Sequence, residues 1–371
     1  MPLRGIKVIE LGGLAPGPLC GKFLRDFGAS VTVVNKVVDN TVVDINVVND
    51  GKELVYLDIK SPSGSEIFQK LVASADILIE PFRAGVMEKL NLGPEVLLAN
   101  NPKLIYARLT GYGQSGPLSR VAGHDINYLS LTGLLSLYGW REKYPAPPSN
   151  FSEFAGGSLM CLTGILLALI DRNKTGRGQV IDSNIVEGIS YLGSWLMRSK
   201  NVLFNEPRGH NWLDGGAHFY DTYETKDGKF MAVGALEPKF YQELISKLGF
   251  SYEEAPQMGN NQVREKFQKR FLEKTRDEWV EIFGTSDACV TPVLSIEEAV
   301  KFQHNLDRNS FFQNEDGVIT PIRAPRLSNY PEGAKQMPFR ANDTYTVLQR
   351  LGYSNEKIQE LEEEEIVKCK I

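Results

Sequence analysis

Cysteine and histidine are both scarce, with 4 of each among the 371 residues. The cysteines are widely scattered, and no pair of them has the spacing of metal ligands. The one at Cys161 lies inside an apolar run. We therefore expect reduced, structural thiols at all four positions, with neither a zinc site nor a disulfide framework: Cys20, Cys161, Cys289 and Cys369.

An excess of basic residues is also missing, since 41 Lys and Arg stand against 46 Asp and Glu, for a formal net charge of −5. This balance argues against a general nucleic-acid-binding protein. An anionic ligand would need a local basic site rather than attraction by the whole surface.

No apolar run is long enough to span a membrane. The longest, residues 159–170, is broken only by Thr163 and Gly164, whereas a bilayer needs about 20 residues. It predicts a helix buried inside the protein. The apolar residues 6–11 are interrupted by Lys7 and Glu10, unlike a signal peptide. We expect a soluble protein without a membrane partner.

The order of predicted elements indicates an α/β fold. Residues 6–11, 12–18, 19–27 and 31–34 read as strand, glycine-rich turn, helix and strand, the opening of a parallel α/β unit. The turn lacks the G-x-G-x-x-G fingerprint and contains prolines, so we expect no dinucleotide. Further along, a hairpin around Lys226-Asp227-Gly228 opens an α+β block. The length favours two domains: residues 1–200, a polar linker at 201–219, and residues 220–315.

His124 is the histidine with the most suggestive setting, because it follows Gly123 and precedes a helical pattern that begins at Asp125. A base beside a helix N-terminus suits removal of a proton α to a thioester, since the negative charge of the enolate is stabilised there. Taken alone, these residues favour a plainer interpretation, in which Asp125 caps the helix and His124 lies on the surface.

Two glutamates also stand at the starts of predicted helices. Glu153 precedes the apolar helix, where partial burial would raise its pKa. Glu237 follows an apolar strand and precedes Pro238. For both, a first-turn carboxylate favoured by the helix dipole is the simpler explanation. Asp214 reads as a turn residue.

A collinear series of segments resembles the class III CoA-transferase and α-methylacyl-CoA racemase family (CaiB/BaiF), and is most similar to its racemase branch. The series covers most of the chain, which makes coincidence implausible. It comprises residues 11–18 (LGGLAPGP), 80–87 (EPFRAGVM), 105–117 (IYARLTGYGQSGP), 123–128 (GHDINY), 154–157 (FAGG), 175–182 (TGRGQVID), 213–217 (LDGGA), 232–238 (AVGALEP) and 287–293 (DACVTPV).

The resemblance implies an isomerase that interconverts (R)- and (S)-2-methylacyl-CoA through an enolate, in branched-chain fatty acid and, by extension, bile acid metabolism. It assigns the catalytic base to His124 in the motif that includes Asp125, the group on the opposite face to Glu153, and support of the histidine to Glu237. No cofactor or metal is implied, because one acid–base group on each face suffices.

The resemblance also implies a Rossmann-like large domain that is completed by residues 316–371. Two chains would interlock as a homodimer with shared active sites. The CoA phosphates would be bound by basic residues of the large domain: Lys36, Lys60, Arg83 and Lys89.

Two features depart from the family pattern. Relatives usually carry aspartate at the position of Glu153, and the longer arm shifts the carboxylate; a misplacement on the order of 1 Å costs about 10²-fold in rate. The stretch 31–50 is rich in valine and has Lys36 as its only basic residue. From the first departure we expect slower turnover, turnover biased toward one face, or rescue by a shifted backbone. From the second we expect phosphate binding that is weaker or differently organised.

Two other functions remain open from the sequence. A CoA transferase is the main alternative, although that branch uses an aspartate at position 153 to form an acyl anhydride. A catalytically silent protein that binds CoA thioesters is the other. The final residues Cys369-Lys370-Ile371 resemble a Ser-Lys-Leu peroxisomal address, which favours peroxisomes over mitochondria or cytoplasm.

Overall fold

The computed structural model describes residues 1–37, 47–139, 145–146, 148–258, 261–313, 317–330 and 342–369. The chain forms two compact units. Unit 1 comprises Met1–Leu135, Pro147–Ser194 and Arg323–Ile371, and unit 2 comprises Ser136–Ala146 and Trp195–Ile322. Residues 201–219, expected to form a linker, therefore belong to unit 2. Lys370, Ile371 and residues 38–46 of the valine-rich stretch lie outside the described residues.

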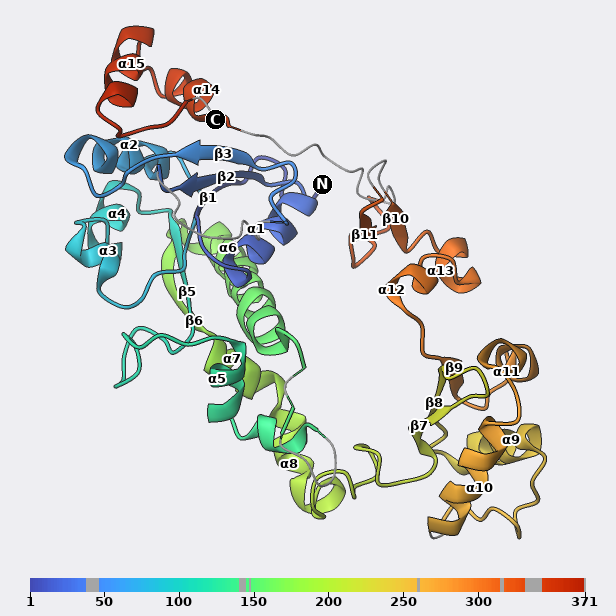
Figure 1. Ribbon diagram of the computed structural model, residues 1–371. Helices are drawn as coiled ribbons and strands as arrows, with labels where there is room; N and C mark the ends of the chain where they lie inside the picture. The colour runs from blue at the N-terminus through green and yellow to red at the C-terminus, as the bar shows by residue number, and fades with distance from the viewer. Residues whose placement is uncertain are drawn as a thin grey trace. The chain divides into compact units, whose positions relative to one another are not determined.

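Unit 1 is built on a six-stranded parallel sheet with the order β3-β2-β1-β4-β5-β6 (Figure 1). The direction of winding reverses between β1 and β4, and in such sheets ligands bind beyond the carboxyl ends of the strands at this point. The predicted α/β class is confirmed. The strands are β1 (Lys7–Leu11), β2 (Ser30–Asn35), β3 (Glu53–Tyr56), β4 (Ile77–Glu80), β5 (Ile105–Thr110) and β6 (Gln179–Asn184).

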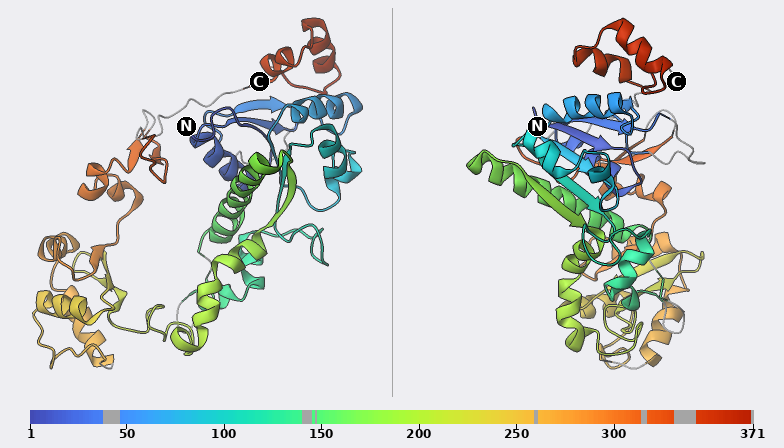
Figure 2. Two further views of the ribbon diagram at one scale, coloured as in Figure 1. Left: turned by 180° about the vertical axis from the view of Figure 1, so that it is seen from behind. Right: turned by 90° about the vertical axis from the view of Figure 1, so that its left-hand side faces the viewer.

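Helices cover both faces of this sheet. On one face α1 (Pro16–Asp26) and α6 (Met160–Thr175) lie side by side (Figures 1 and 2) and share a core with alternate strand residues such as Val8 and Ile77. The core of the other face includes residues of helices from both ends of the chain. These are α2 (Pro62–Ala73), α3 (Val86–Lys89), α4 (Pro94–Asn100), α14 (Thr344–Arg350) and α15 (Asn355–Glu363).

The apolar helix differs from its prediction in length and in burial. It is continuous with a π-helix, η2 (Ser152–Leu159), and together the segment Ser152–Thr175 has 24 residues. By length and composition this segment could cross a membrane, a test that core helices of soluble proteins also pass. It is not buried on all sides within the chain, since Leu167 is 61% and Ile170 55% exposed.

Three shorter helices follow β5 and β6 along the chain. The helix α5 (Asp125–Leu131) is followed by a 3-10 turn, η1 (Leu134–Leu137). After β6 the chain forms two successive helices, α7 (Ile185–Leu192) and α8 (Ser194–Leu203). Gly193 is the C-cap of α7, which explains the break between them.

Unit 2 confirms the predicted hairpin and adds a third antiparallel strand to it. Its core is rich in aromatic residues, with Tyr241, Phe267 and Trp279 fully buried. Its strands are β7 (Tyr220–Glu224), β8 (Phe230–Gly234) and β9 (Val290–Pro292), with a separate pair β10 (Phe311–Gln313) and β11 (Ile319–Pro321). Its helices are α9 (Pro238–Leu248), α10 (Asn261–Phe271), α11 (Arg276–Phe283), α12 (Ile296–Ala299) and α13 (Gln303–Asp307).

Candidate active site

A cavity of about 320 Å³ lies within unit 1 at the carboxyl ends of β1, β4 and β5. This is the position that the reversal of strand order predicts. Each of these strands leads into residues that line the cavity: Gly13 after β1, Phe82 and Arg83 after β4, and Gly111 after β5. The wall is completed by groups with acid–base chemistry, His124, Tyr128 and Glu153.

His124 lies at a helix N-terminus, as the sequence predicted, and is exposed in the single chain. It is itself the N-cap residue of α5, whereas Asp125, which the plainer interpretation made the cap, is the first residue of the helix. The backbone N–H of His124 donates to the side-chain oxygen of Asn127 (3.1 Å), and its carbonyl oxygen accepts from the Asn127 N–H (2.8 Å). The buried Tyr128 hydroxyl donates to the Gly123 carbonyl oxygen. Contacts on both sides therefore fix the backbone that carries the imidazole.

Glu153 is half-buried in the first turn of η2. Its backbone N–H donates to Oδ1 of Asp125 (2.8 Å). The fully buried Ser152 hydroxyl donates to the same oxygen (2.6 Å) and also lies 2.9 Å from the Asp125 carbonyl oxygen. Asp125 follows His124 in the chain and binds the start of η2, which carries Glu153. It therefore links the segments that carry the two acid–base groups.

Burial and two neighbouring residues influence the charge of Glu153. Burial raises the pKa of its carboxyl, the negative charge of Asp125 raises this pKa further, and His124 opposes both effects. The direction agrees with the shift that the sequence predicted. The nearby Tyr128 responds in the same sense, since burial, reinforced by Glu153, raises the pKa of its hydroxyl to about 12. Tyr128 is therefore neutral at physiological pH.

The loop that carries Arg83 is held by a buried ion network. Oε1 of Glu80 accepts from the Phe82 N–H (2.6 Å), and its Oε2 accepts from Nε of Arg108 (2.9 Å). The Arg108 guanidinium also binds the Glu88 carboxylate on α3 (2.7 Å). Burial raises the pKa of Glu80 to about 7, against the opposing effect of Arg108. This network fixes both ends of the loop to the sheet.

The basic residues predicted to bind CoA phosphates fall into two groups. Arg83 is exposed, lines the cavity, and donates through NH1 to the Arg120 carbonyl oxygen (3.2 Å). Lys36, Lys60 and Lys89 are exposed and are not among the residues that line it. Their predicted role in binding the CoA phosphates stays a prediction.

Glu237 belongs to unit 2, where it is the exposed N-cap residue of α9, at the helix start predicted for it. Asp214 is a turn residue, as predicted, because its carboxylate accepts from the N–H groups of Gly209 and Asn211 (both 2.8 Å). The buried His218 is bonded to the Tyr241 hydroxyl (2.8 Å), and burial lowers its pKa to about 4.

Several residues of the site were missed by the sequence analysis. Tyr128, Glu80 and Arg108 lie inside the family motifs, but no role was predicted for them. Ser152 lies just outside the motif at residues 154–157. A buried serine next to an acidic helix-start residue gives no periodic or spacing signal. The register partners Glu80 and Arg108 of neighbouring strands β4 and β5 were in principle detectable as an opposite-charge pair.

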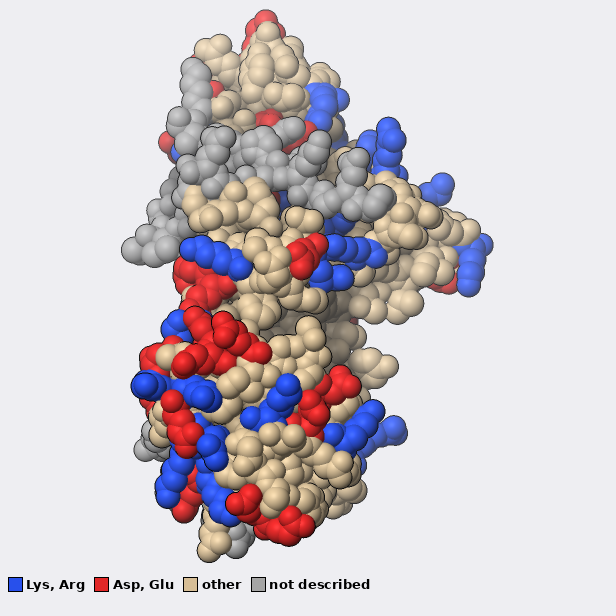
Figure 3. All heavy atoms as spheres, turned by 90° about the vertical axis from the view of Figure 1, so that its right-hand side faces the viewer, with Lys and Arg blue, Asp and Glu red and all other residues tan. Residues whose placement is uncertain are grey.

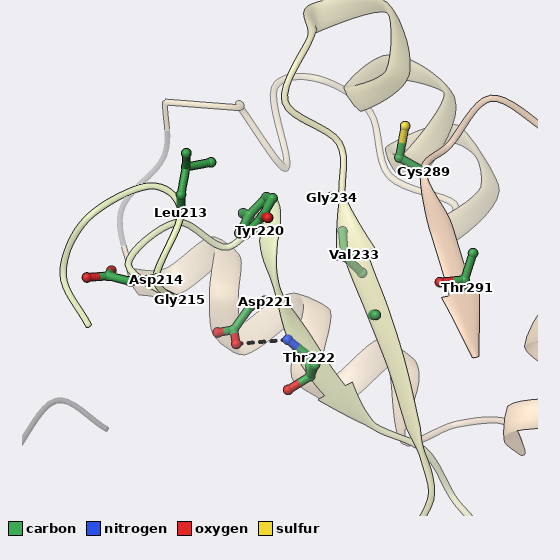
Figure 4. A pocket seen from close by; sticks show the side chains of 11 residues that line it. Leu213, Asp214, Gly215, Tyr220, Asp221, Thr222, Val233, Gly234, Cys289 and Thr291 are labelled. Atoms are coloured by element: carbon green, nitrogen blue, oxygen red, sulfur yellow. Dashed lines mark hydrogen bonds between the residues drawn. The ribbon is translucent and has the colours of Figure 1, made fainter. Parts of the chain in front are cut away.

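Unit 2 contains a cavity of its own, about 470 Å³, between the loop at Leu213 and strands β7 to β9 (Figure 4). Its carboxylates are already engaged. Asp214 closes its turn, and Asp221 is paired with Arg264 and accepts from the Thr222 N–H (2.8 Å). The cavity in unit 1, which contains a half-buried glutamate and a histidine, has the better setting for proton transfer.

Charge on the visible surface is mixed. Lys and Arg side chains alternate with Asp and Glu on the face drawn in Figure 3. This agrees with the balanced composition. Binding of an anion would therefore depend on local groups such as Arg83. Among the described residues, no group of three or more His, Cys, Asp and Glu side chains is arranged to hold a metal ion.

Comparison with known proteins identifies the family of the chain. The family model of CoA-transferase family III matches residues 3–350. The chain is 50% identical to the alpha-methylacyl-CoA racemase of Mus musculus and 49% identical to that of Homo sapiens, each over 99% of this chain and 98% of the relative. A crystal structure of a CAIB/BAIF family protein from Brucella suis has the same fold, with a TM-score of 0.79 at 23% identity, covering 95% of this chain and 99% of that one. The chain belongs to CoA-transferase family III.

Proposed function

We propose that this protein is a racemase that interconverts (R)- and (S)-2-methylacyl-CoA thioesters. The observation that carries the proposal is the placement of two acid–base groups, His124 and Glu153, on the wall of one cavity at the carboxyl end of a parallel sheet. The relatives of about half identity named alpha-methylacyl-CoA racemase support the same substrate class.

The reaction needs one proton removed and one returned. One of the two groups accepts the proton from the α-carbon, and the bonding electrons move onto the thioester oxygen to give an enolate. The other group then donates a proton to the opposite face of the α-carbon. Protons and electrons balance without a redox cofactor or metal, and we propose that none is used.

The surroundings of the two groups suit these roles. Burial and the charge of Asp125 raise the pKa of Glu153, so that its acid form is easier to reach during turnover. His124 stands at the N-terminus of α5, whose dipole favours negative charge on the enolate. We assign the CoA phosphates to Arg83 at the cavity, with Lys36, Lys60 and Lys89 as further contacts.

We also propose that the working form is a homodimer. Apolar side chains of unit 1 are exposed in the single chain: Leu167 is 61%, Tyr191 71% and Leu192 48% exposed. Contiguous exposed apolar surface is typical of association sites. In the family interpretation, the partner subunit's Glu237 supports His124. Sedimentation equilibrium at micromolar concentration should give twice the chain mass, and a monomer would contradict this proposal.

The family description also favours a second candidate, CoA transfer between carboxylic acids. In that reaction Glu153 would form a mixed anhydride with the acyl group. The test is to incubate (S)-2-methylacyl-CoA with enzyme and a second carboxylic acid, and to follow both the epimer ratio and the CoA acceptor. Racemisation predicts a mixture of epimers, reached from either side, without a new thioester. A new thioester, together with hydroxylamine-sensitive inactivation, would establish the transferase instead.

A further inference from the structure

Ser152 makes a set of contacts that the proposed chemistry does not require. Its hydroxyl lies 2.6 Å from Oδ1 and 2.9 Å from the carbonyl oxygen of Asp125, and the residue is 0% exposed. A hydroxyl has a single proton, and the shorter contact to the carboxylate is the charge-assisted one. Removing this donor would leave a buried carboxylate oxygen with one partner fewer, which is costly in a dry environment.

The same carboxylate oxygen also accepts from the backbone N–H of Glu153 (2.8 Å). Asp125 therefore receives two donors from adjacent residues of η2 while belonging to the first turn of α5. This link fixes the start of η2 relative to the backbone of His124, the residue that precedes Asp125 in the chain.

The rest of η2 is held by packing rather than by this link. A Cβ added at Gly188 of α7 would fall 1.9 Å from the Gly156 carbonyl oxygen, so the backbones of η2 and α7 are in direct contact there. Glu153 lies three residues before that contact, in the first turn of the π-helix. π-helical segments are often found at functional sites, and the position of this first turn depends on the Asp125 link.

Glu153 is sensitive to such a link because of its length. A glutamate side chain has one more rotatable bond than an aspartate. It therefore loses more conformational entropy when its carboxylate is held in one position toward a substrate. A shift on the order of 1 Å in a catalytic group costs about 10²-fold in rate. Fixing the backbone at Glu153 should therefore increase the rate more than it would for a shorter acid.

We propose that Ser152 is a positioning residue for Glu153: through the Asp125 carboxylate it fixes the first turn of η2 and so directs the glutamate at one face of the α-carbon. This inference rests on the proposed racemisation. It predicts a defect on one face only, because His124 is held from its other side by Asn127 and by the Tyr128–Gly123 contact.

The test is exchange of the α-proton in D₂O, measured separately for (R)- and (S)-2-methylacyl-CoA. Glu153→Gln identifies the epimer whose proton faces Glu153, because exchange of that epimer is lost. Ser152→Ala should slow exchange of the same epimer by about tenfold, the effect of one buried hydrogen bond, and leave the other epimer within about twofold. Ser152→Thr keeps the hydroxyl and should restore most of the loss.

Ser190→Ala is the matched control, since it removes a hydroxyl from α7 that donates to the Val186 carbonyl oxygen within the same helix (2.7 Å). It should leave the ratio of the two exchange rates unchanged. Equal slowing of both epimers by Ser152→Ala, or no slowing of either, would overturn the positioning role. If the unsubstituted enzyme exchanges neither epimer, the racemase proposal itself fails, which is a separate outcome. If Ser152→Ala does not fold, equal effects of Ser152→Thr on both faces would overturn the inference.

Discussion

Glu153 and His124 line one cavity in very different surroundings. The glutamate is half-buried beside a second carboxylate, whereas the histidine is exposed at the start of a short helix. Asp125 connects the two, because it adjoins His124 in the chain and binds the backbone N–H of Glu153. Asp125 was predicted to belong to the catalytic motif, and that role stays a prediction. Its contacts show that it holds the backbone of Glu153, and its charge raises the pKa of the Glu153 carboxyl.

Replacing Asp125 by asparagine tests its electrostatic part. The negative charge of Asp125 raises the pKa of Glu153; asparagine removes that charge and keeps an acceptor oxygen. The pKa of Glu153 should therefore fall, and Glu153 should stay ionised at lower pH. In a pH profile of α-proton exchange on the Glu153 face, the acidic limb should move to lower pH. A limb that stays in place or moves to higher pH would show that Asp125 does not set this pKa.

A second buried carboxylate contributes to stability. Lys52, which precedes β3, and Glu10 of β1 are both 0% exposed and form an ion pair of 2.8 Å. Lys52→Met leaves Glu10 buried and unpaired, a change that costs about 3–5 kcal/mol. Denaturant unfolding should show this loss, and adding Glu10→Gln should recover most of it. A loss below about 1 kcal/mol in the single variant would mean that Glu10 escapes by protonation or reaches water.

Helices and turns that depend on local interactions were predicted from local sequence signals. The helix α9 begins at Pro238, where its start was predicted, and Gly249 follows its last residue. The hairpin β7–β8 turns at Lys226-Asp227-Gly228 as expected. The helix α2 was missed although Ser61 and Pro62 give a readable start signal: the Ser61 side chain accepts from the Gly64 N–H (3.0 Å).

The π-helix could not be predicted, because its cause is tertiary. Its residues would pass for an α-helix by periodicity, and its packing depends on the close approach of Gly156 to α7, a segment distant in the sequence. In the candidate site, too, some residues could be predicted from the sequence and others could not. The family motifs identified His124 and Glu153, whereas the contacts of Ser152 with Asp125 follow only from the folded chain.

The contact between η2 and α7 gives a prediction at this scale. In Gly188→Ala the new Cβ would fall 1.9 Å from the Gly156 carbonyl oxygen, which cannot move as a flexible side-chain end would. Overpacking of this kind costs about 1–3 kcal/mol or more. Gly17→Ala in α1, with Pro81 Cβ 4.0 Å away, is the control and should be neutral or slightly stabilising. Equal unfolding free energies for both variants would contradict the close contact.

At the scale of the whole molecule, unit 1 is completed by the C-terminal residues. Val347, Leu348, Ile358 and Leu361 are at most 2% exposed and share a core with strand residues of the sheet, among them Leu78. The chain therefore passes from unit 1 into unit 2 and then returns to unit 1. Unit 1 cannot bury this face of its sheet without the return.

Truncation after Ile322 tests that dependence. The shortened chain should lose the cooperative unfolding of unit 1 and become sensitive to proteolysis within residues 1–135, because the apolar face of the sheet is uncovered. Unit 2, whose core is its own, should remain protected and serves as the internal control. Full protection of unit 1 in the truncated chain would show that α14 and α15 are dispensable.

We propose that His124 and Glu153 move protons on opposite faces of one α-carbon. The decisive measurement is to incubate the unsubstituted enzyme with pure (R)- or pure (S)-2-methylacyl-CoA in D₂O and to measure α-deuterium by NMR. Proton transfer on both faces predicts deuterium incorporation from both epimers and convergence on one epimer ratio. The absence of α-deuterium from either starting epimer would contradict it.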